Sequence, residues 1–244
     1  MTSPHQNDAE VIMQNTTYYA AASTLSQEIG SANALSPGLR KPTTLYSVFK
    51  RGIDIFGSFF GLLLLTPVFI IISILIKVED PGGTVFFYQT RVGKSGKHFR
   101  MFKFRSMVSN AEQQLDHLLG KNEIKGAMFK IKNDPRITKV GKFIRRTSID
   151  ELPQLVNVLR GEMSLVGPRP PLPREVLQYT NYDRQRLEVV PGCTGLWQVS
   201  GRNDVGFHEM VELDLYYINN CNVVMDLKIM FRTILVLFGS KNAF

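Results

Sequence analysis

The sequence of 244 residues has few of the residues that build metal clusters or disulfide scaffolds. Its only cysteines are Cys193 and Cys221, and neither belongs to a CxxC or mixed Cys/His pattern. A structural zinc site and a disulfide framework are therefore not indicated. The sequence also contains no GxxxxGK[ST], GxGxxG, HExxH or GxSxG signature. P-loop ATPases, Rossmann enzymes, zincins and esterases consequently gain no support.

Acidic residues are scarce relative to basic ones. The chain has 29 Lys and Arg against 21 Asp and Glu, which gives a net charge of +8. The excess is concentrated between Lys77 and Arg146, where 16 basic residues face 6 acidic ones. Such a cluster predicts an anionic partner, which is a nucleic acid, a lipid head group or a phosphorylated small molecule. No basic and aromatic motif of a known nucleic-acid-binding module is present, so we predict no nucleic-acid partner.

The amino-terminal stretch, residues 1–45, lacks apolar periodicity and is rich in Ser, Thr, Asn, Gln and Ala. It has no basic segment followed by an early apolar run, so it is not a signal peptide. We interpret it as a flexible tail.

Residues 55–76 form a run of 22 residues without a charge. A straight helix of this length crosses the roughly 30 Å hydrocarbon layer of a bilayer, and we assign the membrane helix to residues 46–78. Pro67 removes a backbone hydrogen bond and predicts a kink, while the Thr66 hydroxyl group compensates for part of the loss. Basic residues flank the run on both sides, so the positive-inside rule gives no orientation. A spanning helix and a re-entrant helix that returns to the cytoplasmic face both stay open, and we favour the second.

The rest of the chain, residues 79–244, is predicted to form a cytoplasmic catalytic domain. Short strands are expected at 84–88 and 98–104 around a basic glycine-containing turn. Helices are expected at 108–120, 137–146, 150–160, 173–189, 207–219 and 223–238, with a loop at 191–206. The last helix either docks on the core or lies in the membrane interface. The predicted fold class is α+β and mainly helical, with a re-entrant membrane helix, a small β-hairpin and interfacial amphipathic helices.

Asp150 and Glu151 are the clearest candidates for chemistry. They follow Arg145 and Arg146 where a helix is predicted to begin. A structural alternative exists, because Ser148 and Glu151 have the spacing of a capping box. Pro153 disfavours that alternative, since it would then lie one turn inside the helix and remove a backbone donor. If Asp150 lies nearer the cap, it stands at a helix N-terminus, where phosphate groups bind readily.

A phosphorylated substrate also requires cations, and arginine suits phosphate oxygens. Arg169 is favoured because Pro168 and Pro170 stiffen its backbone. The segment 191–202 has three glycines with polar residues between them, which would let a flat nucleobase or a phosphate approach the backbone. The predicted substrate-binding residues are Lys103, Arg105, Arg145, Arg169, Thr194, Gln198 and Arg202.

Five segments together closely resemble one protein family. They are residues 103–107 (KFRSM), 145–155 (RRTSIDELPQL), 164–170 (SLVGPRP), 191–202 (PGCTGLWQVSGR) and 213–217 (LDLYY). The family is that of the bacterial sugar transferases, also called monotopic phosphoglycosyl transferases, which begin the synthesis of exopolysaccharide, capsule and O-antigen. The likeness covers roughly residues 46–240.

The resemblance implies a two-step reaction at the bacterial inner membrane, with the catalytic domain on the cytoplasmic face. Asp150 matches the family's nucleophile, and Glu151 matches its Mg²⁺ ligand. The implied partners are a UDP-sugar, undecaprenyl phosphate and membrane lipid, and UMP is the implied product. The kinked helix matches the family's re-entrant anchor, although this chain has Thr66 and Pro67 where Ser-Pro is often seen. The alternative is a non-catalytic basic scaffold or regulator of polysaccharide assembly, which would need neither Asp150 nor Glu151. The residues do not reveal which sugar is transferred.

Overall fold

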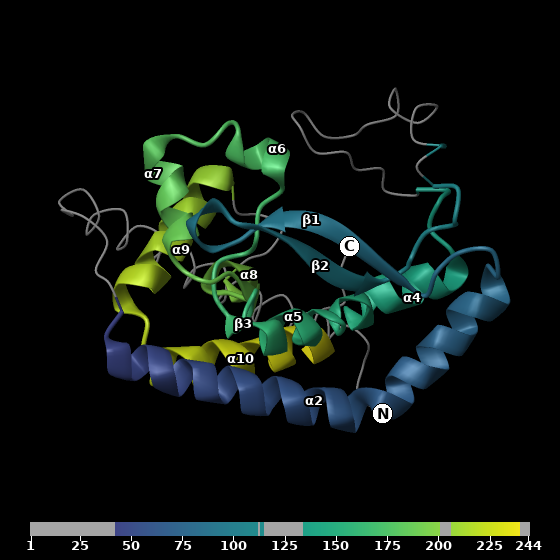
Figure 1. The fold of residues 1–244 in the computed structure, drawn as a ribbon, viewed down its shortest axis with the longest axis horizontal. Coiled ribbons are helices and arrows are strands. Elements are labelled where there is room, and N and C mark those ends of the chain that lie inside the picture. Colours follow the sequence, from purple (N-terminus) through teal and green to yellow (C-terminus); the bar gives the residue numbers. More distant parts are fainter. Residues whose placement is uncertain (1–41, 112, 115–133, 201–205, 240–244) are drawn as a thin grey trace, which may run out of the picture.

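The computed structural model describes residues 42–111, 113–114, 134–200 and 206–239. A long helix is followed by an antiparallel hairpin and then by short helices around a second, parallel strand pair (Figure 1). The helices are α2 (Thr44–Glu79), α4 (Lys139–Arg146), α5 (Gln154–Arg160), α6 (Pro173–Val176), α7 (Asn181–Arg184), α8 (Leu196–Val199), α9 (Phe207–Asn220) and α10 (Val223–Gly239), with 3-10 turns η1 (Lys94–Gly96), η3 (Ile149–Glu151) and η4 (Gln185–Glu188). The strands are β1 (Phe86–Val92), β2 (His98–Phe104), β3 (Ser164–Val166) and β4 (Gly192–Thr194).

Helix α2 is bent, and the rest of the domain lies on the inner side of the bend (Figure 1). Pro67 is the proline inside the helix, and its missing donor explains the bend. The Thr66 hydroxyl group donates to the Leu62 carbonyl at 2.9 Å, as a backbone-compensating side chain in a kinked helix would. Among the described residues α2 is the one helix long and apolar enough to cross a membrane. It starts two residues before and ends one residue after the predicted bounds of 46–78.

Both halves of α2 are joined to the rest of the protein by hydrogen bonds. In the first half, Arg51 donates to the Val158 and Leu159 carbonyls at the end of α5. At the far end, the Glu79 carboxylate accepts from the Lys139 and Val140 amides at 2.7 and 2.9 Å, which caps the first turn of α4. Because α4 and α5 flank Asp150 in the chain, α2 fixes the position of the segment between them.

Another anchor joins α2 to the parallel strand pair. The buried Asp54 carboxylate accepts from the Ser164 hydroxyl group at 3.0 Å and from the Leu165 amide at 2.9 Å. Strand β3 then pairs with β4, in the register Ser164 with Gly192. A side chain on Gly192 would collide with the Gly167 backbone, so this approach requires glycine. The loop that carries Arg169 begins at this point.

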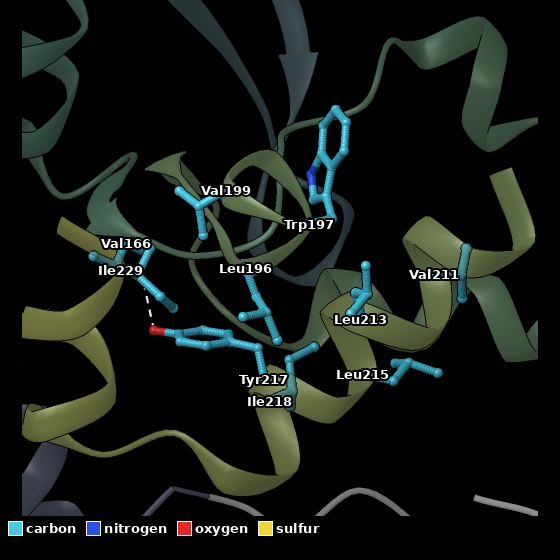
Figure 2. Close-up of a cluster of buried hydrophobic side chains, with 10 residues drawn as sticks. All are labelled: Val166, Leu196, Trp197, Val199, Val211, Leu213, Leu215, Tyr217, Ile218 and Ile229. Carbon is cyan, nitrogen blue, oxygen red and sulfur yellow. Dashed lines mark hydrogen bonds between the residues drawn. The ribbon is translucent and has the colours of Figure 1, made fainter. Parts of the chain in front are cut away.

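The main hydrophobic core lies between β3, α8, α9 and α10 (Figure 2). Figure 2 shows Tyr217 reaching from α9 toward Val166, whose carbonyl accepts from its hydroxyl group at 3.4 Å. The same hydroxyl group donates to Asp226 of α10 at 2.7 Å, and Lys50 of α2 forms an ion pair with Asp226 at 2.9 Å. These contacts hold α2, α9 and α10 together.

Helices α2 and α10 expose large apolar side chains. On α10, Leu227, Phe231, Ile234 and Leu235 are all more than half exposed, whereas Ile229 is buried in the core. These four apolar side chains of α10 therefore point largely away from the protein. Exposed apolar residues on α2 include Phe56, Phe59, Phe60, Leu63, Leu64, Ile70 and Ile71. Contiguous apolar patches of this kind mark contact surfaces for membranes or partners.

Several expected elements differ from the structure. The first strand is Phe86–Val92 rather than 84–88, and the predicted helix 150–160 begins only at Gln154. The predicted helix 173–189 is wrong, because Thr180 caps a new turn with Asp183 and divides the segment into α6, α7 and η4. The predicted loop at 191–206 contains β4 and α8. Most of the predicted helix 108–120 lies outside the described residues.

Asn157 connects β2 to α5 and offers a test of this fold. It is fully buried, accepts from the Phe102 amide at 3.0 Å, and donates at 2.7 Å to the Arg100 carbonyl and at 2.7 Å to the Glu162 carboxylate. Asn157→Ala leaves these groups unpaired, so we expect the unfolding free energy to fall by about 3 kcal/mol. Thermal unfolding in detergent measures this loss. Asn181→Ala, at an exposed position, is the control and should unfold like the wild type. An equally stable Asn157→Ala protein would contradict the connection.

Candidate active site

A cleft of about 540 Å³ lies between the hairpin, η3, the Arg169 loop and α8. Asp150 and Glu151 both line it, together with three of the predicted cations. The polar residues in its wall are Gln89, Arg91, Lys103, Ser106, Arg145, Ser148, Asp150, Glu151, Gln154, Arg169, Cys193, Trp197 and Gln198. The cleft therefore combines two carboxylates with cations that originate from separate parts of the chain.

Asp150 lies in the short 3-10 turn η3, between α4 and α5. Ser148 enters this turn in the left-handed conformation, with φ of 55°, and its side chain makes no capping hydrogen bond. The capping-box alternative is therefore wrong. Pro153 is the N-cap of α5, where its missing amide donor costs nothing. A left-handed serine is uncommon and is typical of a constrained functional turn.

Asp150 is 8% exposed, and this burial raises the pKa of its carboxyl group to about 6. The nearby positive charge of Lys103 opposes the rise, whereas Glu151 adds to it. The Lys103 ammonium group lies 2.7 Å from a Glu151 oxygen and 4.0 Å from an Asp150 oxygen. Lys103 thus bridges the two carboxylates, and Asp150 stays ionised at neutral pH.

Arg145 approaches Asp150 from α4. Its Nε donates to the Ser106 hydroxyl group at 2.8 Å, which fixes the side chain. Burial lowers the pKa of Arg145, and the charge of Asp150 partly offsets this effect. The guanidinium group is consequently a desolvated cation close to the carboxylate, suited to neutralising charge on a phosphoryl group.

Arg169 and Arg91 form a second cationic wall. Arg169 is exposed between the buried Pro168 and Pro170. Arg91 is 5% exposed and donates to the Pro170 carbonyl at 3.0 Å and to Gln89 at 2.7 Å. Burial, followed by the charge of Arg169, lowers the pKa of Arg91 to about 10. Two guanidinium groups that repel one another are stabilised when an anion lies between them.

The structure brings most of the predicted residues together, but not all. Arg105 lies outside the cleft, because its guanidinium group forms a 2.9 Å ion pair with Asp80 and also donates to the Asp80 carbonyl. Thr194 also lies outside the cleft lining and shares a 2.7 Å hydrogen bond with Thr233 of α10. Both residues therefore take structural roles in this geometry. Arg202 lies outside the described residues.

Among the cleft residues that the sequence did not identify as site residues, Arg91 and Trp197 are the most informative. Arg91 was assigned only to a basic turn, since nothing in a linear sequence distinguishes it from its neighbours. Trp197, the single tryptophan of the chain, has its indole Nε1 buried without a hydrogen-bond partner. The presence of a tryptophan in a polar, glycine-containing segment was the feature of the sequence that could have identified Trp197 as a site residue.

The carboxylates suit Mg²⁺, which prefers hard oxygen ligands. Magnesium sites commonly use one or two carboxylates and complete the shell with water and substrate phosphate. Asp150 and Glu151 supply such a pair, and within the described ranges no group of three or more His, Cys, Asp and Glu residues forms a complete protein site. The donor set therefore fits a metal held jointly with a phosphorylated substrate.

A larger cavity of about 850 Å³ lies on the other side of β3, between the start of α2 and α9. Several of its charged groups are engaged within the protein, since Lys50 pairs with Asp226, Asp54 bonds to β3, and Arg51 donates to the end of α5. Neither Asp150 nor Glu151 lines it. The smaller cleft is thus the better candidate for chemistry.

Comparison with known proteins adds independent evidence. Residues 45–240 match the model of a family described as bacterial sugar transferase. The chain is 49% identical over 195 residues to galactosyl transferase CpsE of Streptococcus agalactiae, and 46% identical over 199 residues to the undecaprenyl-phosphate galactose phosphotransferase of Salmonella typhimurium. These alignments cover 79% and 80% of the chain, but only 43% and 41% of the two relatives. It is also 41% identical to the exopolysaccharide production protein ExoY of Rhizobium meliloti, covering 80% of the chain and 88% of that protein.

The raised pKa of Asp150 predicts that its carboxylate destabilises the fold. A buried carboxyl group whose folded pKa exceeds the unfolded value of 3.8 lowers stability as pH rises from about 4 to about 6, and the full cost persists above that range. We expect Asp150→Asn to raise the unfolding free energy by about 1–3 kcal/mol at neutral pH, with the gain vanishing near pH 4. Unfolding measured across this pH range tests it. Glu188→Gln, which removes an exposed charge, is the control and should show no such pH-dependent gain. If Asp150→Asn were less stable than the wild type at neutral pH, burial would not be the main cause of the pKa shift of Asp150.

Proposed function

The chain belongs to the bacterial sugar transferase family, and on this premise we propose that it transfers a hexose-1-phosphate from a UDP-sugar to undecaprenyl phosphate and releases UMP. This reaction would begin the assembly of a surface polysaccharide such as exopolysaccharide, capsule or O-antigen. The observation that carries the proposal is the buried Asp150 carboxylate beside Glu151, Lys103 and Arg145 in one cleft.

Asp150 is the nucleophile of the proposed reaction. One of its carboxylate oxygens attacks the phosphorus that bears the sugar, and the bond from that phosphorus to the bridging oxygen breaks. UMP leaves with the bridging oxygen, and a sugar-phosphoryl-aspartate remains. An oxygen of undecaprenyl phosphate then attacks the same phosphorus, and the aspartyl bond breaks. This second step restores the carboxylate and yields the lipid-linked pyrophosphate sugar.

The surrounding cations serve binding and charge neutralisation. Lys103 keeps Asp150 ionised, and Arg145 and Arg169 are placed to contact phosphoryl oxygens in the cleft. Glu151, with Asp150, would hold Mg²⁺, which when bound neutralises charge on the phosphates. Asp150 needs no general base, because it is ionised at neutral pH with a pKa of about 6.

The proposed location is the cytoplasmic face of the bacterial inner membrane. Arg51 and Glu79 lie on opposite sides of Pro67, yet both contact elements that flank Asp150. A helix that crossed the bilayer would place its two ends on opposite sides of the membrane, so contacts at both ends with one domain favour a re-entrant helix. The exposed apolar residues of α10 then face the same membrane surface.

A non-catalytic scaffold is the alternative, and the cleft argues against it. A scaffold requires the apolar helix and basic surface but has no use for a desolvated carboxylate, which costs stability. The two proposals therefore differ in whether the protein reacts chemically with a UDP-sugar.

Reaction with a donor labelled in the β-phosphate provides the test. Without lipid acceptor, the wild-type protein should retain the label and release about one UMP per active site, as expected for a two-step transfer through an enzyme-bound intermediate. Asp150→Asn should retain none while still partitioning into membranes, because α2 is unchanged. Label retained by Asp150→Asn would exclude this residue as the nucleophile. An unlabelled wild-type protein that nevertheless releases UMP with acceptor would indicate direct transfer.

Glu151→Gln tests the metal assignment separately. Loss of one carboxylate charge weakens divalent cation binding, so we expect the Mg²⁺ concentration for half-maximal UMP release to rise about tenfold or more. Glu188→Gln, at an exposed position outside the cleft, is the control and should keep the wild-type requirement. An unchanged requirement in Glu151→Gln would remove this residue from the metal site.

A further inference from the structure

Buried polar atoms without hydrogen-bond partners are rare in folded proteins, because each costs free energy. Five side-chain atoms of the described residues are of this kind. Two belong to ion-paired arginines outside the cleft, Arg105 and Arg186. The other three belong to residues that line the cleft: Arg91 Nε, Trp197 Nε1 and Gln198 Oε1.

Trp197 and Gln198 are adjacent residues of α8. Trp197 is 8% exposed, and Figure 2 shows its indole extending away from the other side chains of the core cluster. The Gln198 amide nitrogen donates to the Cys193 carbonyl at 3.5 Å, which leaves its oxygen as the unpaired atom. The two residues of this wall therefore carry one unpaired donor, the indole N–H, and one unpaired acceptor, the amide oxygen.

We propose that Trp197 and Gln198 recognise an amide-type group, a carbonyl next to an N–H, on the nucleotide-sugar donor. The indole N–H would donate to the carbonyl, and the Gln198 oxygen would accept from the N–H. The pairing satisfies both orphaned atoms at once, which a phosphate group, having only acceptors at neutral pH, does not do. The inference rests on the proposed function, because it assigns a part of the same substrate to this wall.

A UDP-sugar offers this chemistry in two places. The uracil ring has N3–H between two carbonyl groups, and an N-acetylated sugar has an acetamido group. Recognition of uracil makes the two residues selective for the nucleotide, whereas recognition of the acetamido group makes them selective for the sugar. UMP carries the first group and lacks the second, so it distinguishes the two sources.

Two substitutions remove one orphaned atom each and keep most of the volume: Gln198→Met and Trp197→Phe. Gln185→Met is the matched control, since Gln185 lines the larger cavity and not the cleft. The 244-residue chain in detergent is titrated by calorimetry with UMP and with N3-methylated UMP, which lacks the N3–H donor. Transfer rates are then compared for two UDP-sugars that differ only in a 2-hydroxyl or 2-acetamido group.

If the wall binds uracil, each cleft variant should bind UMP about tenfold more weakly, as loss of one buried hydrogen bond predicts. N3 methylation of UMP should then leave the affinity of Gln198→Met unchanged. It should weaken the binding of UMP to the wild type and to Gln185→Met. If the wall binds the acetamido group, UMP affinity should be unchanged and the preference for the acetamido sugar should fall about tenfold in kcat/KM. Either result supports amide recognition.

Unchanged UMP affinity together with an unchanged sugar preference would overturn the inference. The inference would also be overturned if the only effect of the substitutions were a lower melting temperature of the ligand-free protein. That outcome would show that both atoms have partners within the protein. Failure of the proposed function has a different signature: the wild-type protein itself would bind no UMP and release none from any UDP-sugar.

Discussion

Desolvation of the Asp150 carboxyl group is the constraint on which the rest of the site depends. Burial raises the pKa of this group and thereby disfavours the ionised form that could act as a nucleophile. The positive charge of Lys103 opposes this rise, and the resulting pKa is about 6. The protein thus keeps an ionised carboxylate out of water, and in the proposed reaction this desolvation would favour attack on phosphorus. Arg145 and the Arg91–Arg169 wall are arranged around that charge.

The bent α2 helix gives this arrangement its rigidity. It contacts α5 and β3 before Pro67 and α4 after it, so the turn that carries Asp150 is held from both sides. Both α2 and α10 expose apolar side chains. In the proposed reaction the acceptor, a polyprenyl phosphate, has its phosphate at the boundary of the bilayer, so a membrane-bound α2 would also set the distance between the lipid phosphate and Asp150.

Long, strongly patterned elements were predictable from the sequence. The apolar run with Pro67 indicated α2, and the spacing in residues 207–238 indicated α9 and α10. The parallel pair of β3 and β4 was not predictable, because each strand has three residues and pairs across 28 positions. Such short strands exist only because Asp54 and the Gly167–Gly192 approach hold them together.

The residues of the candidate site were predictable where they are neighbours in the chain. They were not predictable where tertiary packing determines which side chains reach the cleft. Asp150, Glu151 and Arg145 are close in the chain, so the motif identified them together. Arg91 and Arg105 are both arginines of basic segments around the hairpin. In the fold, Arg105 forms an ion pair with Asp80 outside the cleft, whereas Arg91 lines the cleft. Only the tertiary fold distinguishes two such cations, and the same holds for Thr194, which α10 engages through Thr233.

The most direct test is the titration of the Asp150 carboxyl group itself. Infrared difference spectra between the wild type and Asp150→Asn isolate the carbonyl band of this one protonated group as pH is varied. The structure predicts a midpoint near 6, raised by burial above the ordinary aspartate value of 3.8. A midpoint at or below 3.8 would show that the cations outweigh desolvation, and the view of Asp150 as a buried nucleophile would be contradicted.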